Sequence, residues 1–267
     1  VYLVDRTVPM LPERLSNGLC SLRPNEEKLC FSAIFELSPE AEVQQEWFGR
    51  TVIYSDRRFT YQEAQDVIET GRGDLSDEIL LLNDLAQKLR AERFRNGSIN
   101  FERDEAKFEL DENGKPLRVY FKEIKESNQL IEEFMLLANR KVAEFVGRKR
   151  KGVQNSDRTF VYRIHDKPNT DKMAQFRSFV TRFGYQMKAQ GNKAVAKEIN
   201  RLMKKIHGRK EENIISTLAI RSMAKATYST DNIGHYGLAF DYYTHFTSPI
   251  RRYPDRMVHR LLAHYLA

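Results

Sequence analysis

Residues 107–147 read KFELDENGKPLRVYFKEIKESNQLIEEFMLLANRKVAEFVG and contain both kinds of hydrophobic period. Phe108 and Leu110 alternate with polar residues, Asn113-Gly114 supplies a turn, and the alternation resumes at Leu117. Alternating apolar residues on both sides of Asn-Gly are typical of a β-hairpin. From Ser127 onward the apolar residues recur at helical spacing instead, at Ile131, Phe134, Met135, Ala138, Val142 and Phe145. The segment therefore predicts a hairpin followed by a long helix.

Upstream of this segment the sequence predicts two more strands and the start of a helix. Residues 30–35 and 47–54 are rich in aromatic and β-branched residues, and Ser38-Pro39-Glu40 between them supplies a turn. Thr60-Tyr61-Gln62-Glu63 is a capping box, in which the Thr hydroxyl and the Glu carboxylate each bind a backbone N–H group that the helix leaves free. A helix should therefore begin directly after Thr60.

Downstream of the segment, helices dominate. A strand is expected at 160–164, then a helix capped by Thr170, then helices over about 192–207 and 213–226, and Pro254 suits the first turn of a final helix. Strands come first and helices later, without regular βαβ alternation. We therefore expect an α+β fold, a mixed sheet with packed helices, in a single domain over residues 1–267.

Composition narrows the class of protein. The chain has 267 residues and a net charge of +7, from 44 Lys and Arg against 37 Asp and Glu. No apolar run approaches the roughly 20 residues that span a bilayer, so we expect no membrane partner. Two cysteines, Cys20 and Cys30, can form neither a disulfide framework nor a four-ligand zinc site, and we expect a reduced, cytoplasmic setting. The positive charge fits a polyanionic partner, although +7 alone is weak evidence.

The densest group of aromatic and basic residues lies at 235–256, where Arg251, Arg252 and Arg256 follow several tyrosines and phenylalanines. Proteins hold single-stranded nucleic acid by stacking bases on aromatic rings and binding phosphates with arginine. A solvated basic helix end would explain the same residues equally well. Common enzyme motifs such as Gly-x-Ser-x-Gly, the P-loop and His-Glu-x-x-His are absent. His165-Asp166 resembles half of a catalytic triad, but no nucleophile can be assigned to it.

Four runs together resemble the catalytic (RNB) domain of the ribonuclease R and ribonuclease II family, with bacterial ribonuclease R most similar in detail. The first run comprises Tyr2, Val8–Pro12 and Leu15–Leu22, and the other three are Leu130–Asn139, Arg163–Pro168 and His245–Asp255. The resemblance implies a processive hydrolase that degrades single-stranded RNA from its 3′ end to nucleoside 5′-monophosphates. It also implies a monomeric parent enzyme that uses two divalent metal ions, with Mg²⁺ as the physiological ion.

The resemblance implies roles for individual residues. Arg251 matches the arginine that contacts phosphate in the active site, and it is the expected catalytic residue. Tyr2 matches the tyrosine that lies against the 3′-terminal nucleotide and distinguishes ribose from deoxyribose. Phe101 matches the phenylalanine that stacks on the last base. Glu132, with Glu133 as the alternative, matches a glutamate that contacts the terminal sugar, and we expect Arg252 to contact RNA.

One departure from the family concerns the metal. The family's metal-binding aspartates form an Asp-x-Asp-Asp cluster upstream of the Val-Tyr run, and no such cluster occurs in this sequence. We therefore expect no metal ligands here and Mg²⁺ ligands upstream of residue 1. The chain is then an incomplete RNB domain, without cold-shock or OB-fold domains, that is inactive by itself. The alternative is a natural shorter relative that binds RNA without cutting it.

Overall fold

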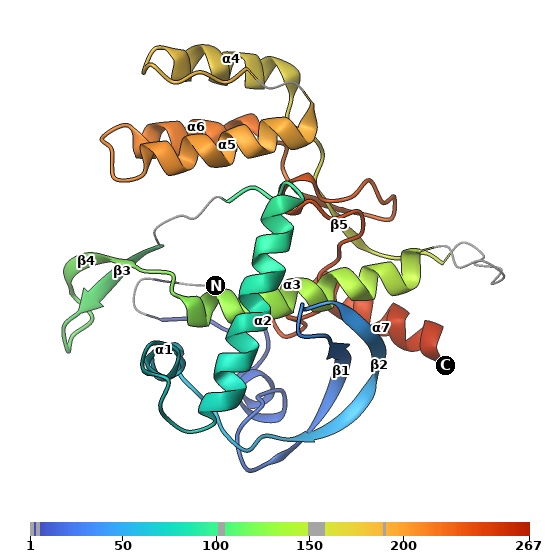
Figure 1. Ribbon diagram of the computed structural model, residues 1–267. Coiled ribbons are helices and arrows are strands. Elements are labelled where there is room, and N and C mark those ends of the chain that lie inside the picture. The colour runs from blue at the N-terminus through green and yellow to red at the C-terminus, as the bar shows by residue number, and fades with distance from the viewer. Residues whose placement is uncertain (1–2, 4–5, 101–104, 149–157, 189–190) are drawn as a thin grey trace. The chain divides into compact units, whose positions relative to one another are not determined.

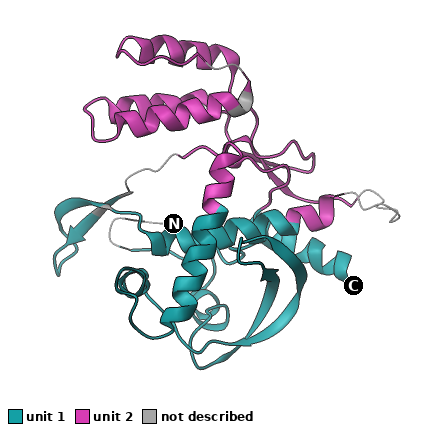
Figure 2. Ribbon diagram, in the orientation of Figure 1, with its two compact units in different colours: residues 1–89, 103–142, 245–267 teal, residues 90–102, 143–244 magenta. Residues whose placement is uncertain are grey.

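A computed structural model describes residues 3, 6–100, 105–148, 158–188 and 191–267 of the chain (Figure 1). Helices and strands are mixed along the chain, which confirms the α+β class. Contacts divide the chain into two compact units (Figure 2). Unit 1 comprises residues 1–89, 103–142 and 245–267, and unit 2 comprises residues 90–102 and 143–244. No helix in the described ranges is both long and apolar enough to cross a membrane.

In unit 1, strand β1 (Glu27–Leu37) pairs antiparallel with strand β2 (Val43–Tyr54). Both strands are longer than the sequence predicted, and the predicted turn at Ser38 joins them. Ser38 N–H donates to Glu42 O at 2.9 Å across that turn. β1 and β2 form a two-stranded sheet, as do the other strand pairs of the described residues, so the strands do not join into one mixed sheet.

The hairpin predicted around Asn113-Gly114 is confirmed. Strand β3 (Glu105–Leu110) pairs antiparallel with β4 (Pro116–Lys122). Asp111 holds the turn, because its carboxylate accepts from the N–H groups of Asn113 at 2.9 Å and Lys115 at 2.8 Å. Gly114 has φ +79, a left-handed conformation that glycine adopts without steric cost.

The capping box is also confirmed, and helix α1 (Tyr61–Thr70) begins where it predicts. Glu63 N–H donates to Thr60 Oγ1 at 3.1 Å, and Thr60 N–H donates to Glu63 Oε2 at 2.7 Å. Helix α2 (Ser76–Arg95) follows. Its Leu85 and Leu89 pack with Ala41 and with Leu137 of helix α3 (Glu126–Gly147) in the core of unit 1.

Helix α3 (Glu126–Gly147) confirms the long predicted helix, but its buried face differs from the one that the apolar period marks. Of the six marked residues, only Val142 is buried, and Ile131 is 44% exposed. The most buried side chains include polar ones, Glu133 and Asn139, which hydrophobic spacing cannot identify. The last helix, α7 (Tyr253–Leu266), has Pro254 in its first turn as predicted, and it buries Asp255, Val258 and Leu262.

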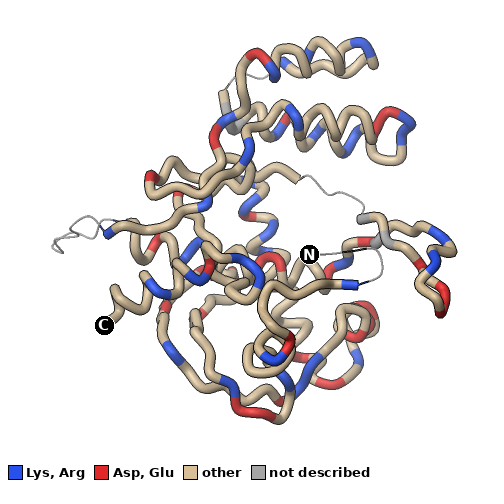
Figure 3. The backbone as a smooth tube through the Cα atoms, turned by 180° about the vertical axis from the view of Figure 1, so that it is seen from behind, with Lys and Arg blue, Asp and Glu red and all other residues tan. Residues whose placement is uncertain are grey.

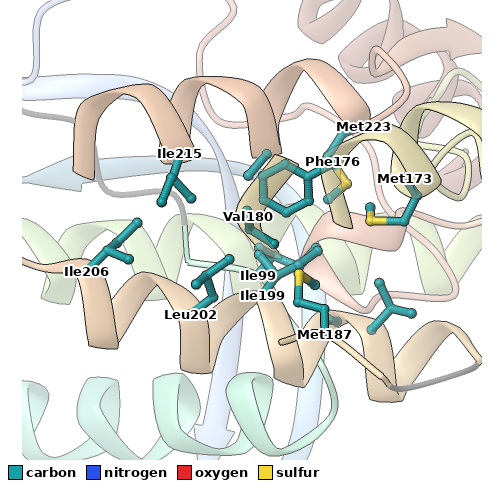
Figure 4. Close-up of a cluster of buried hydrophobic side chains, with 13 residues drawn as sticks. Ile99, Met173, Phe176, Val180, Met187, Ile199, Leu202, Ile206, Ile215 and Met223 are labelled. Carbon is teal, nitrogen blue, oxygen red and sulfur yellow. The ribbon is translucent and has the colours of Figure 1, made fainter. Parts of the chain in front are cut away.

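Unit 2 contains helices α4 (Thr170–Thr181), α5 (Asn192–Ile206) and α6 (Glu212–Ser222), with α6 packed against both others. Their apolar side chains form one core, which Figure 4 shows. Two details differ from the sequence expectation: Asn169, not Thr170, caps α4, and α6 ends at Ser222. The short strands β5 (Tyr162–Ile164) and β6 (Thr227–Ser229) pair antiparallel.

Candidate active site

The segment 245–255, singled out in the sequence, forms a tight turn that leads into helix α7. The N–H groups of Arg251 and Arg252 both donate to Ser248 O, at 3.2 and 3.0 Å. Arg252 has an extended backbone (φ −132, ψ 119) and stands at the N-cap position of α7. The chain therefore reverses direction between Ser248 and Arg252, and Arg251 stands at the end of the turn.

The Asp255 side chain joins the two ends of this turn. It is fully buried, with 0% of its surface exposed. Its Oδ2 accepts from Ser248 N–H at 2.8 Å, and its two oxygens accept from Arg252 Nε at 2.8 Å and Arg252 Nη2 at 2.9 Å. Two parallel bonds from one guanidinium to one carboxylate are a strong, geometrically specific pairing. Asp255 also lies in the first turn of α7, where the helix dipole favours a negative charge.

Helix α3 holds the start of the same segment through Asn139. Asn139 is 2% exposed, and its Oδ1 accepts from Phe246 N–H at 2.8 Å and from Thr247 N–H at 3.3 Å. These bonds connect residues more than a hundred positions apart in the sequence. They satisfy two backbone donors, and the buried one, Phe246 N–H, would be costly to leave without a partner.

Helix α7 and strand β1 complete the support of Phe246. His259 Nε2 donates to Phe246 O at 2.8 Å. The His259 and Phe246 rings are 4.5 Å apart between centroids, and Phe31 of β1 approaches Phe246 edge-on at 5.8 Å. Burial lowers the pKa of His259 below its ordinary value of 6.5, and the bond to Phe246 and the nearby Asp255 carboxylate offset part of that shift.

The two arginines at this turn have different environments. Arg252 is paired with Asp255, and only 25% of its side chain is exposed. Arg251 is exposed, and its guanidinium forms no ion pair with any residue that the structure describes. An exposed guanidinium on a firmly held backbone can bind a phosphate without first breaking an internal ion pair. Arg252 therefore holds the turn, whereas phosphate binding by Arg251 and an RNA contact by Arg252 both stay predictions.

Glu132 lies on the same helix that holds the turn. It is exposed, whereas the neighbouring Glu133 is 3% exposed, so Glu132 is the one of the pair that a ligand can reach. Seven residues separate Glu132 from Asn139, which is nearly two turns and about 10 Å along the helix axis. Glu132 and Asn139 therefore lie on one side of α3. Tyr2 and Phe101, the two predicted aromatic contacts, lie outside the described residues.

The His165-Asp166 pair has a structural explanation. His165 Nδ1 accepts from Gly237 N–H at 2.9 Å, so Nε2 carries the proton and donates to Ala224 O at 2.9 Å. Both ring nitrogens are thus bound to backbone, and burial lowers the pKa of the imidazole. His165 holds three segments of unit 2 together, and a role as general base would require breaking these bonds.

The described residues do not fit a metal site. Within the ranges that the structure describes, no three His, Cys, Asp or Glu side chains are placed to hold a metal ion. Asp255, the carboxylate closest to Arg251 in sequence, already accepts three hydrogen bonds. We therefore assign no chemical step to a metal held by these residues.

Sequence reasoning missed the three residues that build the turn: Asn139, Asp255 and His259. Asn139 and Asp255 both lie inside runs that carry the family resemblance. Their positions were thus marked, but their function depends on contacts between α3, the turn and α7 that spacing does not reveal.

Comparison with known proteins identifies the family. The RNB domain matches residues 1–267, the whole chain. The chain belongs to the RNB family. Ribonuclease R 1 of Lactococcus lactis subsp. lactis (strain IL1403) is 40% identical over 98% of this RNB chain, which covers 32% of that protein. DIS3-like exonuclease 2 of Schizosaccharomyces pombe is 39% identical over 98% of the chain, which covers 30% of that protein.

The solved structures agree with this assignment. Mycoplasma genitalium RNase R in complex with ribose methylated single-stranded RNA matches 97% of the RNB chain with a TM-score of 0.85 and 27% identity. The chain covers 40% of that structure. It spans about a third of the length of the curated relatives that it matches. The family resemblance drawn from four sequence runs is confirmed.

The buried Asp255 should matter for stability. Asp255→Ala removes the acceptor of Ser248 N–H and leaves a largely buried arginine without its partner, so we expect the free energy of unfolding to fall by roughly 3 kcal/mol. Urea denaturation measures this. Asp56→Ala, an exposed aspartate of the same unit, is the control and should change the free energy by less than about 0.5 kcal/mol. Equal effects of the two changes would contradict the role given to Asp255.

His259 should titrate below its ordinary pKa. Because the unfolded chain binds a proton near pH 6.5 and the folded chain only at lower pH, the stability that neutral His259 contributes is complete above 6.5. It is lost as the pH falls through the folded pKa. The His259 Cε1–H resonance, assigned by its disappearance in His259→Gln, should titrate in NMR with a midpoint below 6.5. A midpoint above that value would show that the charged form is favoured instead.

Proposed function

We propose that this chain is the part of an exoribonuclease that binds the 3′ end of single-stranded RNA and hydrolyses it in the 3′→5′ direction to nucleoside 5′-monophosphates. The RNB family and relatives that carry the name ribonuclease R support this proposal. So does the M. genitalium relative, whose structure contains single-stranded RNA. The observation that carries the proposal is the exposed Arg251 on a turn fixed by Asp255 and Asn139.

Arg251 acts on the phosphate in this proposal. Negative charge increases on the phosphate oxygens as the scissile bond breaks, and a guanidinium held at that position stabilises it. The bonds from Asp255, Asn139 and His259 fix the backbone before substrate binds, so little reorganisation is needed during the reaction. Arg252 positions the turn through Asp255.

The other predicted residues complete the substrate site. Glu132 contacts the terminal sugar from the exposed side of α3. Tyr2 and Phe101 contact the terminal nucleotide and its base. Ribose differs from deoxyribose by its 2′-hydroxyl, which accepts and donates hydrogen bonds. A carboxylate and an aromatic residue at the terminal sugar therefore provide selectivity for RNA.

The Mg²⁺ ions of the proposed reaction require ligands other than the described residues of this chain. When bound, such ions polarise the phosphate and supply hydroxide. We propose that the aspartates that hold them are contributed from outside these 267 residues.

A second function has one observation in its favour. Because no metal-binding cluster occurs among the described residues, an RNA-binding module without hydrolysis fits the same turn. The two functions differ in whether the protein releases mononucleotides in the presence of Mg²⁺.

Arg251→Ala tests the proposal in the protein expressed from its own gene. We expect the single-turnover rate of hydrolysis of a 5′-labelled RNA oligonucleotide with Mg²⁺ to fall on the order of 10²–10³-fold. RNA affinity should change by less than about tenfold, or about 1.4 kcal/mol, because the other contacts to the strand remain. Arg260→Ala is the control, since Arg260 is also an exposed arginine without an ion pair to any described residue.

Two results would reject the proposed role. An unchanged single-turnover rate together with lost RNA binding would make Arg251 a docking residue. RNA binding without any release of mononucleotides by the wild-type protein would favour the non-catalytic function.

A further inference from the structure

Unit 2 contains a large pocket that the proposed function does not use. It lies between one face of α4, the C-terminal end of α6, residues 223–226 and Arg163 of β5, all within unit 2. Its volume is about 1170 Å³. Small-molecule sites in proteins measure about 300–1,000 Å³, so the pocket is large enough for a nucleotide.

The floor of the pocket is apolar and partly aromatic. Phe176 and Met223 line it and also belong to the buried core of the helices, as Figure 4 shows. Phe179, one turn after Phe176 on α4, lines it as well, and its ring packs on Phe183 at 5.1 Å. A fixed aromatic and aliphatic surface accepts a flat ring without regard to its hydrogen-bonding edge, as nucleobase stacking sites do.

The rim of the pocket is basic. Four cations line it and no carboxylate does: Arg163, Lys172, Arg221 and Lys225. None of them forms an ion pair with a described residue. The Arg163 guanidinium instead packs over the Tyr228 ring at 4.6 Å, and the other three are exposed. Figure 3 shows how often Lys and Arg recur along the helices of unit 2.

This arrangement favours an anion. Like charges around one concave surface repel each other, and a bound polyanion relieves that repulsion. Asp166 and Asp171 are close in sequence, but neither lines the pocket to neutralise it. An apolar floor below a cationic rim matches a ligand with a flat apolar part and an attached phosphate.

We propose that this pocket binds a nucleotide, with its base against Phe179 and its phosphate on the rim formed by Lys172, Arg221 and Lys225. The nucleotide is either free or part of an RNA chain. That the nucleotide can belong to an RNA chain rests on the proposed function. The pocket and its positive charge are observed independently of that function. All residues of the pocket belong to unit 2, whereas Arg251 belongs to unit 1.

Binding measurements on the 267-residue chain test this proposal. The probes are 5′-AMP, followed by calorimetry, and a fluorescein-labelled single-stranded oligoadenylate, followed by anisotropy. Every titration contains EDTA, which removes Mg²⁺ and prevents hydrolysis. The titrations therefore measure binding alone, and their result does not depend on whether the protein has exonuclease activity.

The decisive variant is Arg221→Glu with Lys225→Glu. We expect it to weaken binding at least about tenfold. The slope of log affinity against log salt for the oligonucleotide should also fall by about 1.4, since each phosphate contact on a single strand contributes about 0.7. The matched control is Lys204→Glu with Lys205→Glu, the same charge change on α5 outside the pocket. It should have little effect, because neither lysine lines the pocket.

Each outcome decides between sources or rejects the site. Loss of binding to both probes shows that a free nucleotide suffices, and loss for the oligonucleotide alone shows that the pocket takes RNA. Binding to neither probe by the wild-type chain, or equal losses in the pocket and control variants, would overturn the proposal. Lys172→Glu, checked by its thermal unfolding midpoint, provides a second variant if the first fails to fold.

Discussion

The buried carboxylate of Asp255 is the interaction on which the candidate site depends. It accepts one backbone N–H from Ser248 at one end of the turn and two guanidinium bonds from Arg252 at the other. A fully buried carboxylate is tolerated only when its charge and its lone pairs are satisfied, and these bonds satisfy them. These bonds therefore close the turn. They hold the Arg252 side chain against Asp255 and leave the Arg251 side chain exposed.

The two adjacent arginines consequently have different roles. Arg252 neutralises Asp255 and stabilises the start of α7, whereas Arg251 remains exposed with no ion pair to a described residue. Asn139 and His259 then fix Phe246, so the same segment is held from α3 and from α7. In the proposed function, the RNA phosphate meets a guanidinium whose backbone is already in place, which is the usual advantage of a preorganised site.

Local sequence signals predicted much of the fold. The capping box of Thr60 and Glu63, the Asn-Gly hairpin and the proline of α7 each depend on the conformation of residues close in the chain, and each was confirmed. The buried faces of α3 and α7 were less predictable. Asn139 and Asp255 are buried because distant or charged partners satisfy them, and an apolar period marks neither these residues nor the buried Glu133.

The candidate site, like the fold, was only partly predictable from the sequence. Residue types and runs pointed to segment 245–255 and to Arg251, but the partners of Arg252 and His165 required coordinates.

The most direct test of the account is a double-mutant cycle of Asp255→Asn and Arg251→Ala, read as the single-turnover rate of RNA hydrolysis by the protein expressed from its own gene. If Asp255 acts by positioning Arg251, the double variant should be no slower than Arg251→Ala alone. Rate losses that multiply would show that the two residues act independently and would contradict the account.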